Sequence, residues 1–503
     1  MGLHDFNLPD VIERNAQLYK DKTAFIDGDR RVTHGEYANR VGRLARGLSR
    51  VGIRAGDRIA VLAHNCLEYV DIYGAAACIG AIVVPLNWRL GSGEIAHAIE
   101  NTTPKLLIAA TGFLPALQEQ IHRFAFVERS YCLGAASASF AQLGDLMAGE
   151  NQAELVKHPD GDCGFVIIHT ASVDGKARGA LLSQGGLVAA NLQFAASWNL
   201  GPCDVLLGVL PLFHALGLGL LLAVQQAGGT TVLMAKFEAA QTLEIIRSEA
   251  VTVMAEFPPM LSTLLEQPGA REQLASLRHV TGLDTAQTID RFEAEFPLAK
   301  FWVVYGQTEV SGPVSFSPYR ERPGSAGRPT MLNRVVIVDD ADRPVQSGTM
   351  GEIVVRGPMV FLGYWNCEEE NAFISRGDWH HTGDIGRIDS DGYLWYGGRS
   401  PAKELIKPGG ENVYPVEVEK ILLEHPSIAQ AVVFGVPDPQ WGEAIKAVCV
   451  CKPGQTAEPQ ELIDFVGGRI ARFKRPKHVV FVESLPRNDQ GLIDRASVKR
   501  SFA

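Results

Sequence analysis

Short apolar runs alternate with amphipathic helical patterns along most of this 503-residue chain. The runs are Arg58–Ala63, Lys105–Ala110, Cys163–His169, Thr231–Ala235, Val251–Glu256 and Phe301–Val304. Amphipathic stretches such as Gly35–Val51 and Glu238–Glu249 lie between them. Strands and helices that alternate in this way predict an α/β fold, in which parallel sheets carry helices on their faces.

The pattern of predicted helices and strands changes twice toward the C-terminus. Around Val335–Val355 short strand patterns with turn residues predict a small antiparallel β subdomain. A cluster of Gly and Pro residues then indicates a domain boundary at Gly397-Gly398-Arg399-Ser400-Pro401. The next 100 residues or so suit an independent α+β domain, with a helix begun by Pro415, strands at Ala431–Phe434 and Ala447–Cys451, and a helix at Gln460–Arg472. We therefore expect two domains, residues 1–398 and 399–503.

Composition narrows the class of protein. Apolar residues make up 46% and charged residues 21% of the chain, which is typical of a globular protein. The net charge of −10 argues against nucleic-acid binding. Eight scattered cysteines without metal-type spacing fit a reducing cytoplasm. No signal peptide pattern opens the sequence, and the longest apolar stretch, Leu216–Val224, is too short to span a bilayer. We expect a cytoplasmic protein without a transmembrane segment.

Four motifs follow one another in the second half of the chain. They are Tyr305-Gly306-Gln307-Thr308-Glu309, His381-Thr382-Gly383-Asp384, Gly398-Arg399 with Lys403-Glu404-Leu405-Ile406-Lys407, and Gly409-Gly410-Glu411-Asn412-Val413-Tyr414-Pro415. The first follows an apolar run, and open α/β sheets bind ligands at the carboxyl ends of their strands. A single acidic group such as Asp384 suits a ribose diol, because a carboxylate accepts two hydrogen bonds. The set of motifs resembles the adenylate-forming superfamily, and the acyl-CoA synthetases in particular, over nearly the whole chain.

This resemblance implies a large N-terminal domain of parallel α/β subdomains with a small β subdomain, followed by a small C-terminal domain that rotates about a hinge. It also implies a site for AMP or an acyl-adenylate. Tyr305 would stack on adenine, Thr308 would touch phosphate, and Glu309 would hold Mg²⁺ if ATP is used. Asp384 and Arg399 would bind the ribose. The expected nucleotide-binding residues are Thr170, Ser172, Arg178, Asp284, Tyr305, Gly306, Gln307, Thr308, Asp384 and Arg399.

The loop expected to bind triphosphate departs from the family pattern. Members carry a Ser/Thr/Gly-rich stretch ending Pro-Lys-Gly, whereas this chain reads Thr170-Ala171-Ser172-Val173-Asp174-Gly175-Lys176-Ala177-Arg178-Gly179. Val173 removes a hydroxyl donor, and Asp174 adds negative charge where phosphates would lie. Arg178 replaces the usual Lys and keeps the positive charge.

A second departure falls on the C-terminal signature Pro-Arg-x-x-x-Gly-Lys-Ile. Here it reads Pro486-Arg487-Asn488-Asp489-Gln490-Gly491-Leu492-Ile493, so the catalytic lysine of adenylation is replaced by Leu492. Leucine cannot stabilise the developing charge, and losing one such donor costs on the order of a hundredfold or more in rate. Arg495 and Lys499 are the alternative cations, at a different phase of the element.

The elements that the family uses for thioester formation are intact. The hinge lies at Lys403 or Glu404, since Ser400-Pro401-Ala402 lengthen the spacing from Arg399. Gly409, Gly410 and Glu411 resemble the loop of the pantetheine channel, where paired glycines let a thin chain pass close to the backbone.

Further residues complete the expected CoA and acyl sites. Lys407 is a candidate for stabilising the acyl phosphate. Trp441 would stack on pantetheine or on adenine. The basic cluster Phe473, Lys474, Arg475 and Lys477, with its one aromatic residue, suits the stacked adenine and the 3′-phosphate of CoA. His214 would gate the acyl site, and nearby glycines leave room for a sizeable apolar acid. The expected catalytic residues are thus His214, Lys407 and Glu309.

Three hypotheses follow. The favoured one is an enzyme that uses a carboxylic acid already converted to its acyl-adenylate and catalyses mainly the attack by CoA. The second is a complete ATP- and Mg²⁺-dependent carboxylate–CoA ligase with a remodelled phosphate loop. The third is an inactive nucleotide-binding protein. The first implies a separate adenylating enzyme as partner, and a homodimer is the default assembly.

Overall fold

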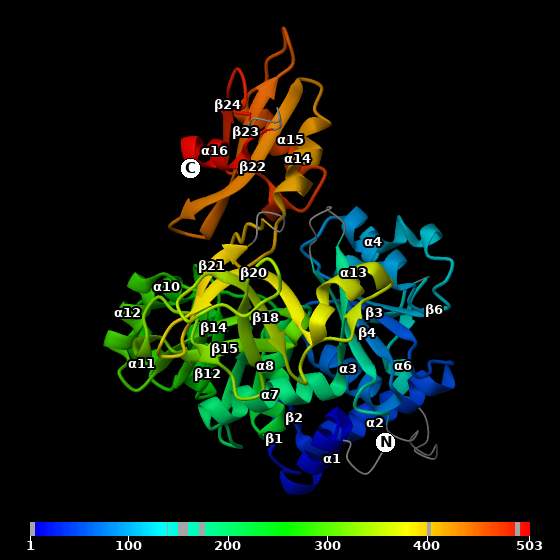
Figure 1. Cartoon of the computed structure of the whole chain (residues 1–503). Coiled ribbons are helices and arrows are strands. Elements are labelled where there is room, and N and C mark those ends of the chain that lie inside the picture. The colour runs from blue at the N-terminus through cyan, green and yellow to red at the C-terminus, as the bar shows by residue number, and fades with distance from the viewer. Residues whose placement is uncertain (1–5, 138, 149–158, 171–176, 400–403, 488–492) are drawn as a thin grey trace.

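The computed structural model describes residues 6–137, 139–148, 159–170, 177–399, 404–487 and 493–503 (Figure 1). Its first large sheet has nine strands. In spatial order they are β16 (Arg328–Pro329), β15 (Gly312–Pro318), β14 (Lys300–Gln307), β13 (His279–Gly282), β12 (Val253–Glu256), β10 (Val205–Gly208), β11 (Thr230–Leu233), β1 (Thr23–Asp27) and β2 (Arg30–Thr33). The strands from β14 to β1 run parallel, as the alternating pattern predicts.

The second large sheet has eight strands. Their order is β19 (Gly363–Tyr364), β9 (Arg178–Ser183), β8 (Gly164–Thr170), β4 (Ile82–Pro85), β3 (Arg58–Leu62), β5 (Leu106–Ala110), β6 (Arg129–Leu133) and β7 (Ala141–Gln142). From β8 to β7 the strands are parallel, whereas β8 and β9 form an antiparallel hairpin around the expected phosphate loop.

One hydrophobic core lies between the two sheets and contains residues from both. It is filled by helices α1 (Leu8–Leu18), α2 (His34–Arg50), α3 (Leu67–Ile79), α7 (Gln184–Trp198) and α8 (Ala215–Gln226). Because protein covers α8 on all sides, its sequence is apolar all round, which explains the longest apolar stretch of the chain. No helix within the described ranges is long and apolar enough to cross a membrane.

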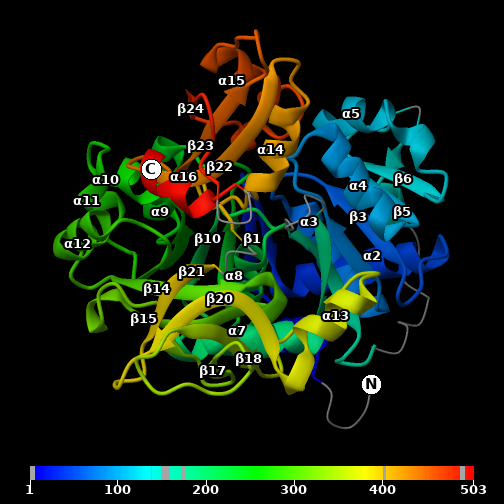
Figure 2. The same cartoon turned by 45° about the horizontal axis from the view of Figure 1, so that its top comes forward.

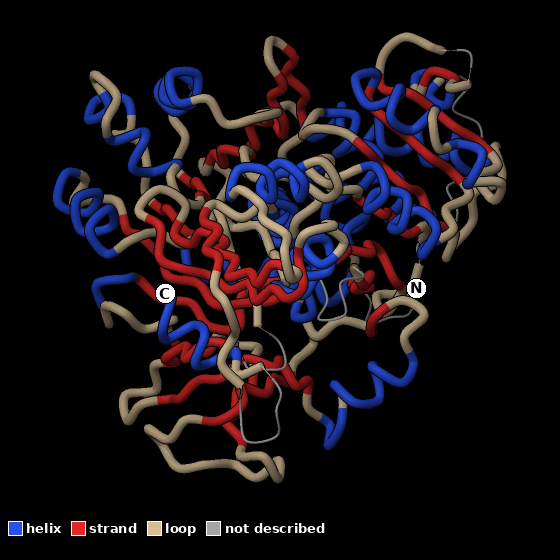
Figure 3. Tube along the Cα trace, turned by 90° about the horizontal axis from the view of Figure 1, so that it is seen from above, coloured by secondary structure: helices blue, strands red, loops and turns tan. Residues whose placement is uncertain are grey.

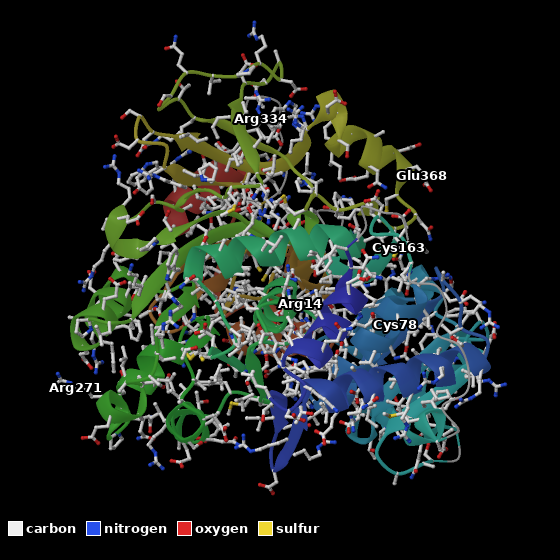
Figure 4. The ribbon with its side chains drawn as sticks, turned by 90° about the horizontal axis from the view of Figure 1, so that it is seen from below. Arg14, Cys78, Cys163, Arg271, Arg334 and Glu368 are labelled. Atoms are coloured by element: carbon white, nitrogen blue, oxygen red, sulfur yellow. The ribbon has the colours of Figure 1, made fainter. Side chains whose placement is uncertain are left out.

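Outer helices cover the other face of each sheet. α9 (Ala239–Ser248), α10 (Met260–Leu265), α11 (Ala270–Gln273) and α12 (Ala286–Glu295) pack on the first sheet, and α4 (Ser92–Thr102) and α5 (Leu114–Gln118) on the second. Seen from above, the strands run between these layers of helices (Figure 3). From below, Arg14 of α1 marks where this helix is tied to the end of α8, by a hydrogen bond to the Gln226 carbonyl (Figure 4).

A smaller antiparallel sheet contains β17 (Arg334–Val338), β18 (Gly351–Arg356), β20 (His380–Ile388) and β21 (Leu394–Arg399). It confirms the antiparallel subdomain predicted around Val335–Val355. Helix α13 (Glu368–Ile374) lies in the connection that leads from β18 to β20.

The C-terminal domain contains a three-stranded sheet of β22 (Ile428–Asp438), β23 (Gly442–Cys451) and β24 (His478–Phe481). Helices α14 (Pro415–Leu423) and α15 (Pro459–Gly467) cover one face, and α16 (Arg495–Phe502) packs on the other. The predicted helix Gln460–Arg472 was too long, because Gly467 and Gly468 end α15 there. Figure 2 shows this domain above the region between the two large sheets.

Candidate functional site

A cavity of about 1900 Å³ lies where the C-terminal domain meets the first large sheet and the small β sheet. Ordinary ligand pockets have volumes of about 300–1,000 Å³, so this one has room for more than one substrate. The ends of β13 and β14 and the residues after β12 line it, which is the carboxyl edge of the parallel sheet. The predicted Thr170, Asp284, Gly306, Thr308 and Glu309 all line this cavity.

Asp384 is the centre of a polar network on the cavity wall. Its side chain is 2% exposed, and its Oδ2 accepts hydrogen bonds from the Tyr305 hydroxyl (2.7 Å) and the Gln307 amide (2.5 Å). Its Oδ1 lies 3.2 Å from Nε of Arg399 and accepts no hydrogen bond from the described residues. A buried carboxylate with one oxygen still available suits a ligand hydroxyl.

The Asp384 network is positioned by the tight turn before it. Gly383 has φ of +69°, which favours glycine, and the Thr382 hydroxyl donates to the Ile353 carbonyl of β18 (2.6 Å). The Thr382 hydroxyl oxygen also accepts a hydrogen bond from the backbone N–H of Asp384 (3.1 Å). These contacts explain why Thr, Gly and Asp occur together in the motif.

Glu309, the last residue of the Tyr305–Glu309 motif, also lines the cavity. Its Oε1 accepts a hydrogen bond from the Tyr364 hydroxyl (2.6 Å). A single carboxylate in the cavity lining suits Mg²⁺, because proteins often hold this ion by one or two carboxylates together with substrate phosphates and water. Arg178 lies above the Tyr364 ring, 5.8 Å from its centroid, and forms an ion pair with Glu370 of α13 (2.5 Å).

The loop after the expected hinge enters the same cavity. Lys407, Gly409, Gly410 and Glu411 line it, together with Trp441. Lys407 is exposed to the cavity but surrounded by protein, and this loss of hydration, with the nearby Arg399 charge, lowers its pKa.

The two glycines of this loop face aromatic rings. A Cβ atom on Gly409 would lie 3.0 Å from the Trp441 ring, and one on Gly410 would lie 2.8 Å from the Phe257 ring of the N-terminal domain. Both residues have positive φ, +56° and +83°. The loop thus needs glycine at both positions, for conformation and for space.

Glu411 joins the two domains. It accepts a hydrogen bond from Arg89 and lies 3.4 Å from Nε2 of His214, and both partners belong to the N-terminal domain. Burial opposes its ionisation, but His214 and Arg89 outweigh it and lower the pKa of Glu411 to about 2. His214 is therefore a partly exposed partner of a carboxylate at the cavity, and its side chain is not enclosed in the apolar core.

The predicted CoA cluster divides into two groups. Trp441, Phe473, Arg475 and Lys477 line the cavity, although Lys477 forms an ion pair with Asp438 (2.5 Å). Lys474 is instead buried between the domains, where it pairs with Glu94 of α4 (2.6 Å) and with Glu417 of α14. It is therefore a contact between domains, which its sequence neighbours did not indicate.

Glu404, one of the two residues expected at the hinge, pairs with Arg495 (3.2 Å) and Lys499 (3.5 Å). Arg495 also pairs with Glu419 (2.6 Å). These two cations line the cavity but are held by acids of their own domain. Ser172, Lys403 and Leu492 lie outside the described residues.

Sequence reasoning missed several residues of the site. Arg89 and Tyr364 contact Glu411 and Glu309, and Phe257 faces Gly410. The Gly363-Tyr364-Trp365 triplet was a signal for a positioned aromatic residue, whereas Arg89 and Phe257 carry none, because their partners are far away in the sequence.

Comparison with known proteins agrees with this geometry. The family described as "AMP-binding enzyme" matches residues 12–365, and "AMP-binding enzyme C-terminal domain" matches residues 417–492. The chain is 34% identical to a feruloyl-CoA synthase of Amycolatopsis sp, over 97% of this chain and 98% of that protein. It is 33% identical to an indoleacetate–CoA ligase of Aromatoleum aromaticum, over 99% and 98%.

A solved structure shares both fold and sequence. The crystal structure of a putative long-chain-fatty-acid CoA ligase from Rhodopseudomonas palustris is 48% identical, with a TM-score of 0.77, and covers 79% of this chain and 100% of its own. With a cavity shared by both matched regions and motifs in the order of the family, the chain belongs to the family of AMP-binding enzymes, as an adenylate-forming enzyme of the acyl-CoA synthetase type.

Proposed function

We propose that this enzyme forms an acyl-CoA thioester and catalyses mainly the second half-reaction, acyl-AMP plus CoA to acyl-CoA plus AMP. The CoA sulfur bonds to the acyl carbon, the bond from that carbon to the phosphate oxygen breaks, and the thiol proton is released. Relatives named as CoA synthases and CoA ligases over almost the whole chain support the chemistry.

The observation that carries this proposal is the shared cavity. The Lys407–Glu411 loop and Trp441 line the same space as Asp384, Arg399 and Tyr305. In our proposal, Asp384 and Arg399 hold the ribose of the acyl-adenylate, and Lys407 offsets charge on its phosphate. The pantetheine arm passes Gly409 and Gly410, with Trp441 beside it.

We also propose that the C-terminal domain rotates about a hinge. We place the domain boundary between residues 398 and 399 and the hinge at Lys403–Glu404, so the C-terminal domain turns to bring its loop to the N-terminal domain. His214 gates the acyl site and contacts Glu411 of that loop. Phe473, Arg475 and Lys477 bind the nucleotide end of CoA.

The elements expected to bind ATP depart from the family pattern, and this supports the restriction to the second half-reaction, the attack of CoA on the acyl-adenylate. Leu492, Val173 and Asp174 replace groups that would bind triphosphate or stabilise its transition state. Arg178, which replaces the lysine of the family pattern, is paired with Glu370. A separate adenylating enzyme would then supply the acyl-adenylate.

A complete ATP-dependent ligase is the second candidate. It is favoured by Arg495 and Lys499, which line the cavity and carry positive charge. In this case Glu309 would hold Mg²⁺ with the phosphates of ATP.

A paired assay on one preparation distinguishes the two. One arm contains a panel of fatty and aromatic acids with Mg-ATP and CoA, and the other contains the matching synthetic acyl-AMPs with CoA. We expect thioester in the second arm at least about a hundredfold faster than in the first. Comparable rates would establish the complete ligase, and no turnover in either arm would contradict both candidates.

A further inference from the structure

Glu256, the last residue of β12, is a buried acid that the proposed function does not use. It is 0% exposed, and neither carboxyl oxygen accepts a hydrogen bond from the described residues. The backbone N–H of Leu261 approaches the carboxyl group but falls short of hydrogen-bonding geometry. A buried polar group without a hydrogen-bond partner lowers the stability of a protein by about 1–3 kcal/mol. A role in binding would explain why Glu256 occupies this position.

The sheet register places this side chain next to residues that line the cavity. Glu256 is paired with Gly282 of β13, and Gly282 with Val303 of β14, so the three residues share one face of the sheet. Because Gly282 has no side chain, nothing at that position separates the side chains of Glu256 and Val303. The carboxyl group leans over it, since a Cβ atom on Gly282 would lie 3.2 Å from Oε1 of Glu256. Gly282 and Val303 both line the cavity.

A second acid lies beside the first. Asp284, two residues after the end of β13, lines the cavity. Its Oδ1 accepts a hydrogen bond from the backbone N–H of Thr285 (2.6 Å), but its Oδ2 is buried and has no partner among the described residues. Burial raises the pKa of both acids, and the Asp284 charge raises that of Glu256 further.

The rest of this part of the cavity is apolar. Ile289, Phe301 and Val303 line it and belong to or pack against the core on the α9–α12 face. Next to these hydrophobic walls lie two carboxyl groups with unused hydrogen-bonding capacity, that of Asp284 in the cavity lining and that of Glu256 beside Gly282.

We infer that Glu256 and Asp284 form a subsite for a hydrogen-bond donor, a hydroxyl or amino group, at the far end of the acyl substrate. The inference rests on the proposed function and narrows its substrate class to acids with an apolar body and a polar, donating end. Sites built to hydrogen-bond such a group can reject the analogue that lacks it by about 10⁴–10⁵-fold. In the proposed complex with an acyl-adenylate, the 6-amino group of adenine would be the alternative donor for these carboxyl groups.

Binding measurements test the inference without turnover. The probes are non-reactive acyl-sulfamoyl adenosines of 3-(4-hydroxyphenyl)propanoic acid and of 3-(4-methylphenyl)propanoic acid, titrated by calorimetry, with AMP alone as a third ligand. We expect wild-type protein to bind the hydroxyl compound at least about tenfold more tightly than the methyl compound. Glu256→Leu should abolish this preference and leave AMP binding unchanged, whereas Glu256→Gln, which keeps size and hydrogen-bonding groups, should retain most of it.

Three outcomes would overturn the inference. Equal binding of the two compounds by wild-type protein would make the acid pair structural, and this result needs no variant to fold. A loss of AMP binding in Glu256→Leu equal to its loss of the hydroxyl compound would assign the pair to adenine. An equal loss of preference in Glu293→Gln, a second buried glutamate whose carboxyl group accepts from the Phe301 N–H (2.8 Å), would make the effect non-specific. Failure of the thioester assay would leave these binding results interpretable, so the two proposals fail separately.

Discussion

Position 492 carries leucine where the family signature has the lysine of adenylation. If adenylation is impaired, as we propose, restoring the cation should restore part of that step, because one preorganised donor is worth on the order of a hundredfold or more in rate. We expect Leu492→Lys to raise ATP–pyrophosphate exchange by about that factor and to leave the rate from synthetic acyl-AMP unchanged. Leu492→Met, similar in size and uncharged, is the matched control. If wild-type protein already exchanges rapidly and Leu492→Lys adds nothing, another cation performs the step.

At the scale of elements, the Lys407–Tyr414 loop carries the next prediction. Gly410→Ala introduces a Cβ at positive φ and within 2.8 Å of the Phe257 ring of the other domain. Gly454→Ala is a matched control in the same domain, because Gly454 has φ of +73° and nothing within 4 Å of its Cβ position. Each should cost about 1–2 kcal/mol of stability through its backbone.

The two variants should differ in kinetics. Gly410→Ala forces the loop away from Phe257, so we expect a higher KM for CoA and a lower kcat with acyl-AMP, at unchanged AMP affinity. Gly454→Ala should match wild type in all three quantities. Steady-state kinetics with calorimetric AMP titration provides the comparison, and identical CoA parameters for the two variants would contradict a CoA path between Gly410 and Phe257.

Elements with a strong local signal were predictable from the sequence. The apolar runs that form β3, β5, β8, β11, β12 and β14 and the amphipathic patterns of α2 and α9 are confirmed within a few residues. The predicted C-terminal end of α15 was wrong, because the Gly467-Gly468 pair ends the helix although the amphipathic pattern continues. Contacts between distant segments carry no local signal: Glu411 and Arg89 are 322 positions apart, and Glu256 reads in the sequence only as the end of a strand.

At the scale of the whole molecule, Glu94 of α4 holds the C-terminal domain against the N-terminal domain. Its Oε1 accepts from Lys474 Nζ (2.6 Å), and its Oε2 accepts from the backbone N–H of Ala471 (3.1 Å) and of Gly91 (2.9 Å). Burial opposes the charge of Lys474, but Glu417 and Glu94 raise its pKa, so this contact is between charged groups.

Glu94→Gln removes that charge and keeps the shape and the cap of α4, since Gln serves in a capping box as well as Glu. Lys474 would keep Glu417 as its partner, so we expect the closed arrangement of the domains to lose about 1–3 kcal/mol while each domain stays folded. X-ray scattering should show a larger radius of gyration for this variant. The rate of thioester formation from acyl-AMP and CoA should fall in proportion to the fraction of molecules in which the two domains remain in contact. Glu100→Gln on the same helix removes an ion pair with Arg123 (2.8 Å) in which both side chains are 38% exposed. Such a pair is worth about 0–1 kcal/mol, and if both variants open the molecule equally, Glu94 has no special part in holding the domains together.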